Sequence, residues 1–191
     1  MMIERIFYPV STLGPGERIV IWARGCSKRC RNCVSPEMWQ PRPDKNIPHS
    51  QLFGFVKNII DKNQVEGITV SGGDPLEQPN GLLKFIADIH VHCCDILVYT
   101  GYTLDEIRGI LTAEQIGILM EKSAVLIDGK YIHELNDGIS PLIGSTNQQI
   151  HYFNEGIREK YENYMSNYGR QVQNVYYGDK LLSVGIHNRE M

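Results

Sequence analysis

The sequence contains no long hydrophobic run, and this absence excludes two classes of protein. The first ten residues include Glu4 and Pro9, which interrupt any signal-peptide core, and no later stretch approaches the roughly 20 apolar residues that a transmembrane helix needs. Strong charge of one sign is also missing, because 19 Lys and Arg stand against 22 Asp and Glu, for a net charge of -3. Without a basic field, neither nucleic acid nor an anionic membrane is an expected partner. We expect a cytoplasmic protein.

Cysteine is scarce, and its distribution argues against a disulfide scaffold. The chain has five cysteines, an odd number, and three of them, Cys26, Cys30 and Cys33, fall within one short segment. Such clustering is typical of a metal site in a reducing compartment. Internal repeats and low-complexity segments are also missing. At 191 residues and 42% hydrophobic content, the chain is expected to form one compact core.

The hydrophobic pattern alternates between strands and helices. Short apolar or β-branched runs predict strands at residues 19–23, 67–71, 96–99 and 124–127. Three helices are predicted: one capped by Ser50 with Leu52, Phe55, Val56, Ile59 and Ile60 on its apolar face, one burying Leu82, Ile86 and Ile89, and one burying Leu104, Ile107 and Leu111. The alternation predicts an α/β fold with a parallel sheet. Because eight complete units need ~250 residues, we expect a partial, open β/α barrel with its chemistry at the carboxyl ends of the strands.

The last part of the chain has a different texture. Asn154 is a candidate cap for a helix whose face would carry Ile157, Tyr161, Tyr164 and Tyr168. Two strand-like runs then flank Gly178-Asp179, a spacing typical of a hairpin with a type II′ turn. We therefore expect a core over residues 1–153 and a helix-and-hairpin extension over 154–191 that packs on the same domain.

The cysteine loop, residues 25–39, reads GCSKRCRNCVSPEMW and has the spacing C-x3-C-x2-C. Three thiolates this close in sequence can bind three corners of an iron-sulfur cluster and leave one iron without a protein ligand. A zinc site completed by Cys93 or Cys94 is an alternative, although structural zinc usually takes its cysteines in C-x2-4-C pairs. Three unligated buried thiols are a further alternative. Lys28, Arg29 and Arg31 make the loop polar; they can offset cluster charge, meet an acidic electron donor, or simply be solvated.

The cysteine spacing resembles that of the radical S-adenosylmethionine superfamily. The resemblance implies that Cys26, Cys30 and Cys33 hold one four-iron four-sulfur (4Fe-4S) cluster, whose open iron is chelated by the amine and carboxylate of S-adenosylmethionine. It also implies that Asn32 and Val34, on either side of the third cysteine, contact this cofactor. Asn32 stands where the superfamily often has an aromatic residue. The partial barrel expected above is the fold of this superfamily.

A glycine pair follows the second predicted strand, in the segment SGGDP at residues 71–75. Glycines at a strand end let a ligand approach the backbone, although a tight turn explains such a pair equally well. Beside the cysteine loop, the segment is similar to the part of the superfamily that binds the methionyl amine. Gly72, Gly73 and Asp74 are therefore candidate cofactor contacts.

Two further candidates lie at the ends of later strands. Thr100 can donate or accept a hydrogen bond within a cofactor pocket. Asp128 and Lys130 offer a carboxylate and an ammonium group, which alone would suggest an ordinary loop ion pair. They resemble the Asp-x-Lys element of glycyl-radical activating enzymes, which implies that both bind the cofactor and that Lys130 meets its carboxylate.

The ordered series of motifs is more specific than any one of them. From Tyr8-Pro9-Val10 through the cysteine loop, SGGDP, YTGYTLDEI and VLIDGKYIHEL to GSTNQ, the chain resembles the activating proteins of anaerobic (class III) ribonucleotide reductase. The resemblance implies an anaerobic oxidoreductase that takes an electron from a flavodoxin- or ferredoxin-type donor, cleaves S-adenosylmethionine to a 5′-deoxyadenosyl radical, and generates a glycyl radical on a partner enzyme. The residues leave two alternatives open: the same chemistry on a small molecule or peptide, and a non-catalytic iron-sulfur electron carrier.

Overall fold

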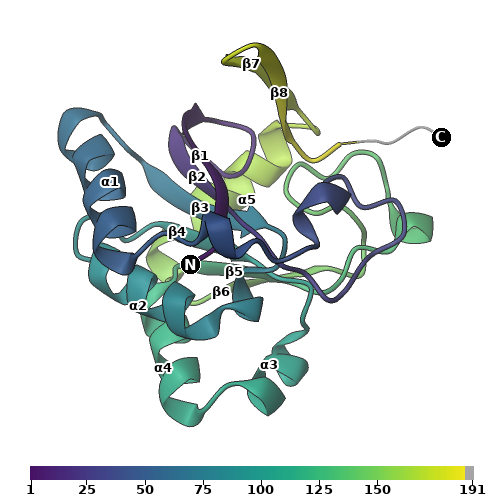
Figure 1. Cartoon of the computed structure of the whole chain (residues 1–191). Helices are drawn as coiled ribbons and strands as arrows, with labels where there is room; N and C mark the ends of the chain where they lie inside the picture. Colours follow the sequence, from purple (N-terminus) through teal and green to yellow (C-terminus); the bar gives the residue numbers. More distant parts are fainter. Residues whose placement is uncertain (188–191) are drawn as a thin grey trace.

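The protein is built on a mixed sheet in which parallel strands predominate (Figure 1). The computed structural model describes residues 1–187, and within them the larger sheet has six strands in the order β1-β2-β3-β4-β5-β6. They are β1 (Ile3–Val10), β2 (Arg18–Ala23), β3 (Gly67–Gly72), β4 (Ile96–Tyr99), β5 (Val125–Asp128) and β6 (Gln149–Tyr152). Strands β2 to β5 run parallel to one another, while β1 and β6 pair antiparallel at the two edges. The predicted α/β class is confirmed, and the four predicted strands are parallel within a sheet whose two edge strands are antiparallel.

Helices connect the parallel strands and cover the sheet. The α-helices are α1 (His49–Lys62), α2 (Pro79–Ile89), α3 (Leu104–Ile110), α4 (Ala113–Lys122) and α5 (Arg158–Asn167). Short 3-10 helices are η1 (Pro36–Met38), η2 (Pro43–Lys45), η3 (Pro75–Glu77), η4 (His133–Leu135) and η5 (Glu155–Ile157). Among residues 1–187, none of the helices combines the length and the apolar character required to cross a membrane.

One helix prediction needs correction, and one helix was missed. Helix α1 begins at His49 with Pro48 as its cap, so Ser50 lies inside the helix, and Phe55 is 51% exposed rather than part of the buried face. The helix predicted from Leu104, Ile107 and Leu111 is α3, which ends at Ile110 with Leu111 as its cap. Helix α4 was not predicted from the sequence, and it begins separately because Thr112 forms a complete capping box of its own.

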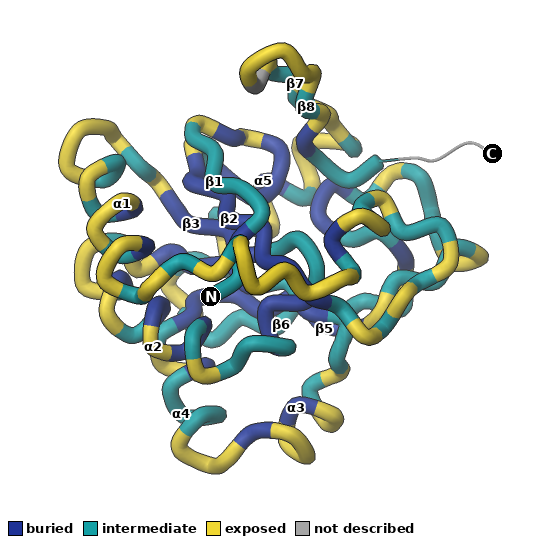
Figure 2. The backbone as a smooth tube through the Cα atoms, in the orientation of Figure 1, coloured by how far each residue is buried: buried dark blue, intermediate teal, exposed yellow. Residues whose placement is uncertain are grey.

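Apolar side chains pack on both faces of the sheet, and the buried residues concentrate along its strands (Figure 2). On one face, alternate strand residues such as Ile68 and Val98 join the apolar sides of α1, α2 and α4. On the other face, Leu97 and Val125 pack with Tyr161 and Tyr164 of α5. Because side chains alternate between the two faces of a strand, the sheet contributes to two apolar layers. One layer lies against α1, α2 and α4, and the other lies against α5.

The amino ends of the parallel strands meet around a buried ion pair. Arg18 is completely buried, and its guanidinium lies 3.0 Å from a carboxylate oxygen of Asp95. The same guanidinium donates to the Thr69 hydroxyl at 2.8 Å. From α5, the Tyr161 hydroxyl donates to Asp95 at 2.7 Å and the Lys160 ammonium lies 3.1 Å from it. Burial acts to raise the pKa of Asp95, but Arg18, Tyr161 and Lys160 together lower it.

The C-terminal part forms the predicted helix and hairpin. Asn154 caps the short helix η5 through a hydrogen bond from Gly156 N, and α5 follows; Tyr168 at its end is 48% exposed. Strands β7 (Val172–Tyr177) and β8 (Lys180–Gly185) pair antiparallel in a separate two-stranded sheet. Gly178 takes a φ of +59°, as the first position of a type II′ turn requires. In Figure 1 this hairpin projects from one side of the main sheet.

Candidate metal and cofactor site

A pocket lies at the carboxyl ends of the parallel strands, where the sequence predicts the chemistry. Loops from far apart in the sequence form its wall. From the cysteine loop and the strand ends the lining residues are Cys26, Lys28, Cys30, Asn32, Cys33, Val34, Trp39, Ser71, Gly72, Gly73, Asp74, Tyr99, Thr100 and Gly101; later segments add Gly129, Tyr131, Gly144, Gln148, Gly185, Ile186 and His187. The structure thus brings nine of the predicted site residues together in one pocket, namely Cys26, Cys30, Asn32, Cys33, Val34, Gly72, Gly73, Asp74 and Thr100.

Backbone hydrogen bonds hold the cysteine loop in place. Cys26 N donates to the Trp39 carbonyl at 3.0 Å, which joins the two ends of the loop. Within it, Arg29 and Asn32 take left-handed conformations, with φ of 44° and 56°. Such conformations are uncommon for residues other than glycine and let a short segment turn sharply around a central point. The three cysteines consequently face one pocket instead of pointing along an extended chain.

The first two thiols are half-buried, and each receives a backbone donor. Burial raises the pKa of Cys26, while the backbone N–H groups of Lys28 and Arg29 oppose the rise. Burial also raises the pKa of Cys30, and the N–H of Tyr131 opposes it. Donors directed at sulfur stabilise the thiolate form, which is the form that binds metal.

The third thiol is similarly placed: Cys33 Sγ accepts a hydrogen bond from Ser35 N at 3.4 Å. In the described part of the chain, no three His, Cys, Asp or Glu side chains gather closely enough to hold a single metal ion. An iron-sulfur cluster differs from a single ion in binding each thiolate at a separate iron atom. Three separate sulfur donors on one pocket wall, each with a backbone N–H toward it, suit the chemistry of such a cluster.

The glycine pair lets β3 approach the start of the cysteine loop. Gly72 has a φ of +108°, and a Cβ there would collide with the Ala23 carbonyl oxygen. A Cβ on Gly73 would collide with the Gly25 carbonyl oxygen, which accepts a hydrogen bond from Asp74 N at 2.7 Å. Close backbone approach is thus one reason for glycine here, and both residues still line the pocket.

The Asp74 side chain joins two strand ends beneath the pocket. One carboxylate oxygen accepts from Thr100 Oγ1 at 2.9 Å and from Leu76 N at 3.0 Å, while the other accepts from Gly101 N at 2.8 Å. Burial raises the pKa of Asp74 to about 6, and these three donors oppose the rise. The predicted contacts Asp74 and Thr100 therefore bind each other and fix the relative position of β3 and β4.

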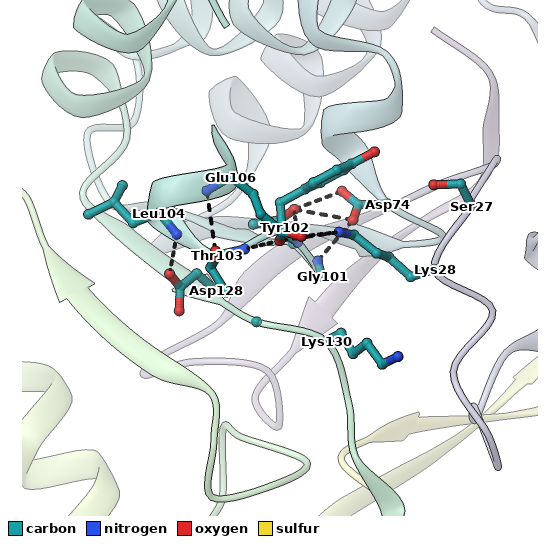
Figure 3. A network of polar contacts seen from close by, with 12 residues as sticks. Ser27, Lys28, Asp74, Gly101, Tyr102, Thr103, Leu104, Glu106, Asp128 and Lys130 are labelled. Atoms are coloured by element: carbon teal, nitrogen blue, oxygen red, sulfur yellow. Dashed lines mark hydrogen bonds and ion pairs between the residues drawn. The ribbon is translucent and has the colours of Figure 1, made fainter. Parts of the chain in front are cut away.

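Lys28, a cation in the cysteine loop, contacts residues at the start of α3 (Figure 3). The Lys28 ammonium lies 3.7 Å from the centre of the Tyr102 ring and 3.2 Å from the Glu106 carboxylate. Glu106 also closes the capping box of Thr103. Nearby, Ser27 and Tyr102 both donate to Glu77, which belongs to η3. These contacts hold the cysteine loop against the loops that follow β3 and β4.

Asp128 and Lys130 lie on different sides of the loop after β5. The Asp128 carboxylate accepts from Leu104 N at 2.7 Å and lies 3.0 Å from Nε2 of His151. Lys130 is exposed and points away from Asp128, toward the side on which Lys28 lies (Figure 3). Neither residue lines the pocket, although the charge of Lys130 acts on the pKa of Cys30. Their predicted contact with a cofactor stays a prediction.

Two buried donors in the pocket wall have no hydrogen-bond partner among residues 1–187. They are Asn32 Nδ2 and Trp39 Nε1. An unpaired buried donor costs free energy, so such groups in a pocket indicate a ligand that supplies acceptors. The nucleoside and carboxylate of S-adenosylmethionine are rich in acceptors, and the residues present fit this cofactor. Trp39 was not predicted as a site residue from the sequence. Its carbonyl accepts the hydrogen bond from Cys26 N, and this bond holds Trp39 in the pocket wall.

Other lining residues were not among the predicted contacts, although Gln148 belongs to the motif series. Gln148, in the segment GSTNQ, uses its side-chain amide to accept from Gly144 N at 2.8 Å and to donate to the Gly129 carbonyl at 2.8 Å. It therefore shapes the loop after β5 and has both amide atoms engaged within the protein. Gly185, Ile186 and His187, at the end of β8 and directly after it, also line the pocket but belong to no sequence motif.

Comparisons with known proteins agree with the pocket chemistry. A family model described as a 4Fe-4S single cluster domain matches residues 12–151. The anaerobic ribonucleoside-triphosphate reductase-activating protein of Escherichia coli (strain K12) is 33% identical over 152 residues, which cover 76% of this chain and 96% of that protein. The protein of the same name from Haemophilus influenzae is 34% identical, with 77% and 96% covered, and that of Enterobacteria phage T4 is 29% identical, with 82% and 97% covered. The chain belongs to the family of anaerobic ribonucleoside-triphosphate reductase-activating proteins.

Proposed function

We propose that this protein is a radical S-adenosylmethionine enzyme that generates a glycyl radical on an anaerobic ribonucleotide reductase. The observation that carries the proposal is the convergence of Cys26, Cys30 and Cys33 on one pocket in a chain of this family. When bound there, a reduced 4Fe-4S cluster supplies an electron that splits S-adenosylmethionine into methionine and a 5′-deoxyadenosyl radical, which takes a hydrogen atom from a glycine of the partner. The reductase is the proposed partner because the relatives are named as proteins that activate it.

The residues of the chain bind the cluster, orient the cofactor and shield both from water. The three thiolates hold the cluster, and the backbone N–H groups near their sulfurs stabilise its negative charge. Gly72 and Gly73 let the amino-acid half of the cofactor lie close to the backbone. Asn32 and Trp39 donate to acceptor atoms of the cofactor, and Val34 adds an apolar wall. Proton transfer by a side chain is not needed, so the protein contributes position and exclusion of water.

Several broader inferences accompany this proposal. We infer that the sheet is the partial, open barrel of the radical S-adenosylmethionine type, because its parallel strands place every candidate motif at one end. We infer a core over residues 1–153 and an extension over 154–191, since the family match ends at residue 151. A flavodoxin- or ferredoxin-type donor, a cytoplasmic location, and no nucleic-acid or membrane partner complete the proposal.

The direct test is the production of 5′-deoxyadenosine by the reduced protein after its cluster has been reconstituted without oxygen. The wild-type protein should convert S-adenosylmethionine to this product and should place a radical signal on the reductase when the two are mixed. Asp128→Ala and Lys130→Ala should weaken cofactor binding while leaving iron content unchanged. A wild-type protein that holds its cluster and forms no 5′-deoxyadenosine would reject the proposal.

A further inference from the structure

The C-terminal hairpin has one inward and one outward face. Leu182 and Val184 of β8 turn inward; Val184 is 2% exposed and packs with Val10 and Trp22 of the main sheet. The outward face carries Tyr176 and Leu181, which are directly opposite one another across the hairpin and are 85% and 62% exposed. The hairpin therefore lies on the protein by one face only.

Hydrogen bonds fix the base of this hairpin to the end of β1 and to the loop that follows it. Thr12 Oγ1 donates to the Val184 carbonyl at 2.9 Å, in a buried position. The side chain of Gln173 accepts from Ser11 N at 3.1 Å and donates to the Pro9 carbonyl at 3.0 Å. Contacts on both strands hold the base in one orientation, so the direction in which the chain leaves β8 is defined.

The chain turns at Gly185 and enters the pocket wall. Gly185 has a φ of +145°, and a Cβ there would collide with the Gln171 carbonyl oxygen, so this turn requires glycine. The next two residues, Ile186 and His187, line the same pocket as Cys26 and Trp39. The hairpin thus delivers a segment from the end of the chain to the cofactor pocket.

Of the two side chains, Ile186 is the better placed to act on a ligand. It packs partly against the apolar cluster that contains Val184 and Met38, so its position is fixed by its neighbours. Its remaining surface belongs to the pocket wall, where an apolar side chain displaces water from whatever is bound. His187 instead places its ring nitrogen 3.3 Å from the Ser183 carbonyl.

We propose that the C-terminal extension completes the cofactor pocket and that Ile186 is a further binding residue, which packs on the bound S-adenosylmethionine and shields the cluster from solvent. This inference rests on the proposed function for the identity of the ligand. The family match covers residues 12–151, so the wall comes from a part of the chain outside the shared pattern. Cofactor affinity and cluster protection in this protein accordingly depend on its last segment.

The test compares Ile186→Ala with Leu182→Ala in the full-length, cluster-loaded protein. Both residues pack against the same apolar cluster, Leu182 from β8 and Ile186 from the segment directly after it, but Leu182 does not line the pocket. The first measurement is the dissociation constant of S-adenosylmethionine by equilibrium titration, and the second is the rate at which the visible absorbance of the cluster is lost in air. Ile186→Ala should weaken binding about fivefold and accelerate cluster loss, because apolar area is no longer covered. Ile186→Val should keep most of the wild-type affinity for S-adenosylmethionine and most of the cluster lifetime in air.

Leu182→Ala should change the same two quantities by less than about twofold, since it removes only packing remote from the ligand. Wild-type affinity and cluster lifetime in Ile186→Ala would overturn the inference, and so would equal losses in Leu182→Ala. A wild-type protein that takes up the cluster but does not bind S-adenosylmethionine would reject the proposed function instead. In that case, cluster loss in air still tests whether the segment shields the pocket.

Discussion

At the amino ends of the parallel strands, the buried Arg18 network satisfies its own polar groups, whereas at the carboxyl ends two buried donors in the pocket wall have no partner among residues 1–187. The Arg18 guanidinium is completely buried yet bonds Thr69 and Asp95. In the pocket, Asn32 and Trp39 each retain a buried donor with no partner among residues 1–187. Burial alone therefore does not mark a functional site in this protein. The balance of donors and acceptors separates the region that stabilises the fold from the region that binds.

The largest effect should come from the pocket side. Cys30→Ala should abolish cluster binding, because the remaining two thiolates cannot hold three corners of the cluster. Iron and sulfide content after reconstitution under nitrogen, together with visible absorbance, measures the loss. Cys94→Ala is the matched control, since Cys94 is exposed and lies outside the pocket lining. Equal iron content in Cys30→Ala and Cys94→Ala would show that the pocket thiols do not bind the cluster, and the carboxyl ends of the strands would then not be the binding region.

At the opposite end of the strands, Arg18→Met should lower the free energy of unfolding by about 3–5 kcal/mol, because it leaves the buried Asp95 carboxylate without its main partner. Urea unfolding of the metal-free protein measures this change. At temperatures where the variant is folded, its cluster uptake should match that of the wild type. A variant of unchanged stability would contradict the structural role of the amino-end network.

Tyr161→Phe sharpens the same comparison within α5. The Tyr161 hydroxyl donates to the buried Asp95 carboxylate at 2.7 Å, and loss of this charge-assisted bond should cost about 1.5–3 kcal/mol. Tyr164→Phe serves as the control, because the Tyr164 hydroxyl donates to the neutral Ser11 carbonyl and should cost only about 1 kcal/mol. The two values come from parallel urea titrations. A larger loss in Tyr164→Phe would show that the charge on Asp95 is not what matters.

The smallest effect should come from Trp39→Phe, which keeps an aromatic wall and removes only the unpaired indole donor. S-adenosylmethionine should bind about fivefold more weakly, equivalent to one neutral hydrogen bond, with the stability of the protein unchanged or slightly raised. Trp22→Phe makes the same chemical change in β2, away from the pocket lining, and should leave binding unaltered. Undiminished binding in Trp39→Phe would mean that the ligand does not use this donor.

Much of the framework could be predicted from the sequence because it is encoded locally. The strand at Ile96–Tyr99 has its predicted bounds, and the helix residues Leu82, Ile86 and Ile89 are buried as expected. The cysteine spacing and the glycine pair identify residues that meet in one pocket. Parallel topology explains this, because it carries the end of each strand to the same edge of the sheet.

What sequence reasoning missed depends on contacts between distant segments. Trp39 acquires its place through a backbone bond to Cys26, and no pattern in the chain specifies that pairing. Ile186 reaches the pocket wall from a hairpin that Thr12 and Gln173 anchor to the main sheet through hydrogen bonds between distant segments. The expected burial of Phe55 was wrong for a related reason, since a helical apolar pattern does not say how wide the buried face is.

The paramagnetic resonance spectrum of the reduced cluster, recorded with and without S-adenosylmethionine, shows whether one iron is open to the cofactor. Three protein thiolates leave one iron open, so binding of the cofactor at that iron should shift the spectrum, and the shift should be reversed when the cofactor is removed. A spectrum that stays identical at saturating S-adenosylmethionine would contradict the account, because it would mean that the cluster has no open position facing the pocket.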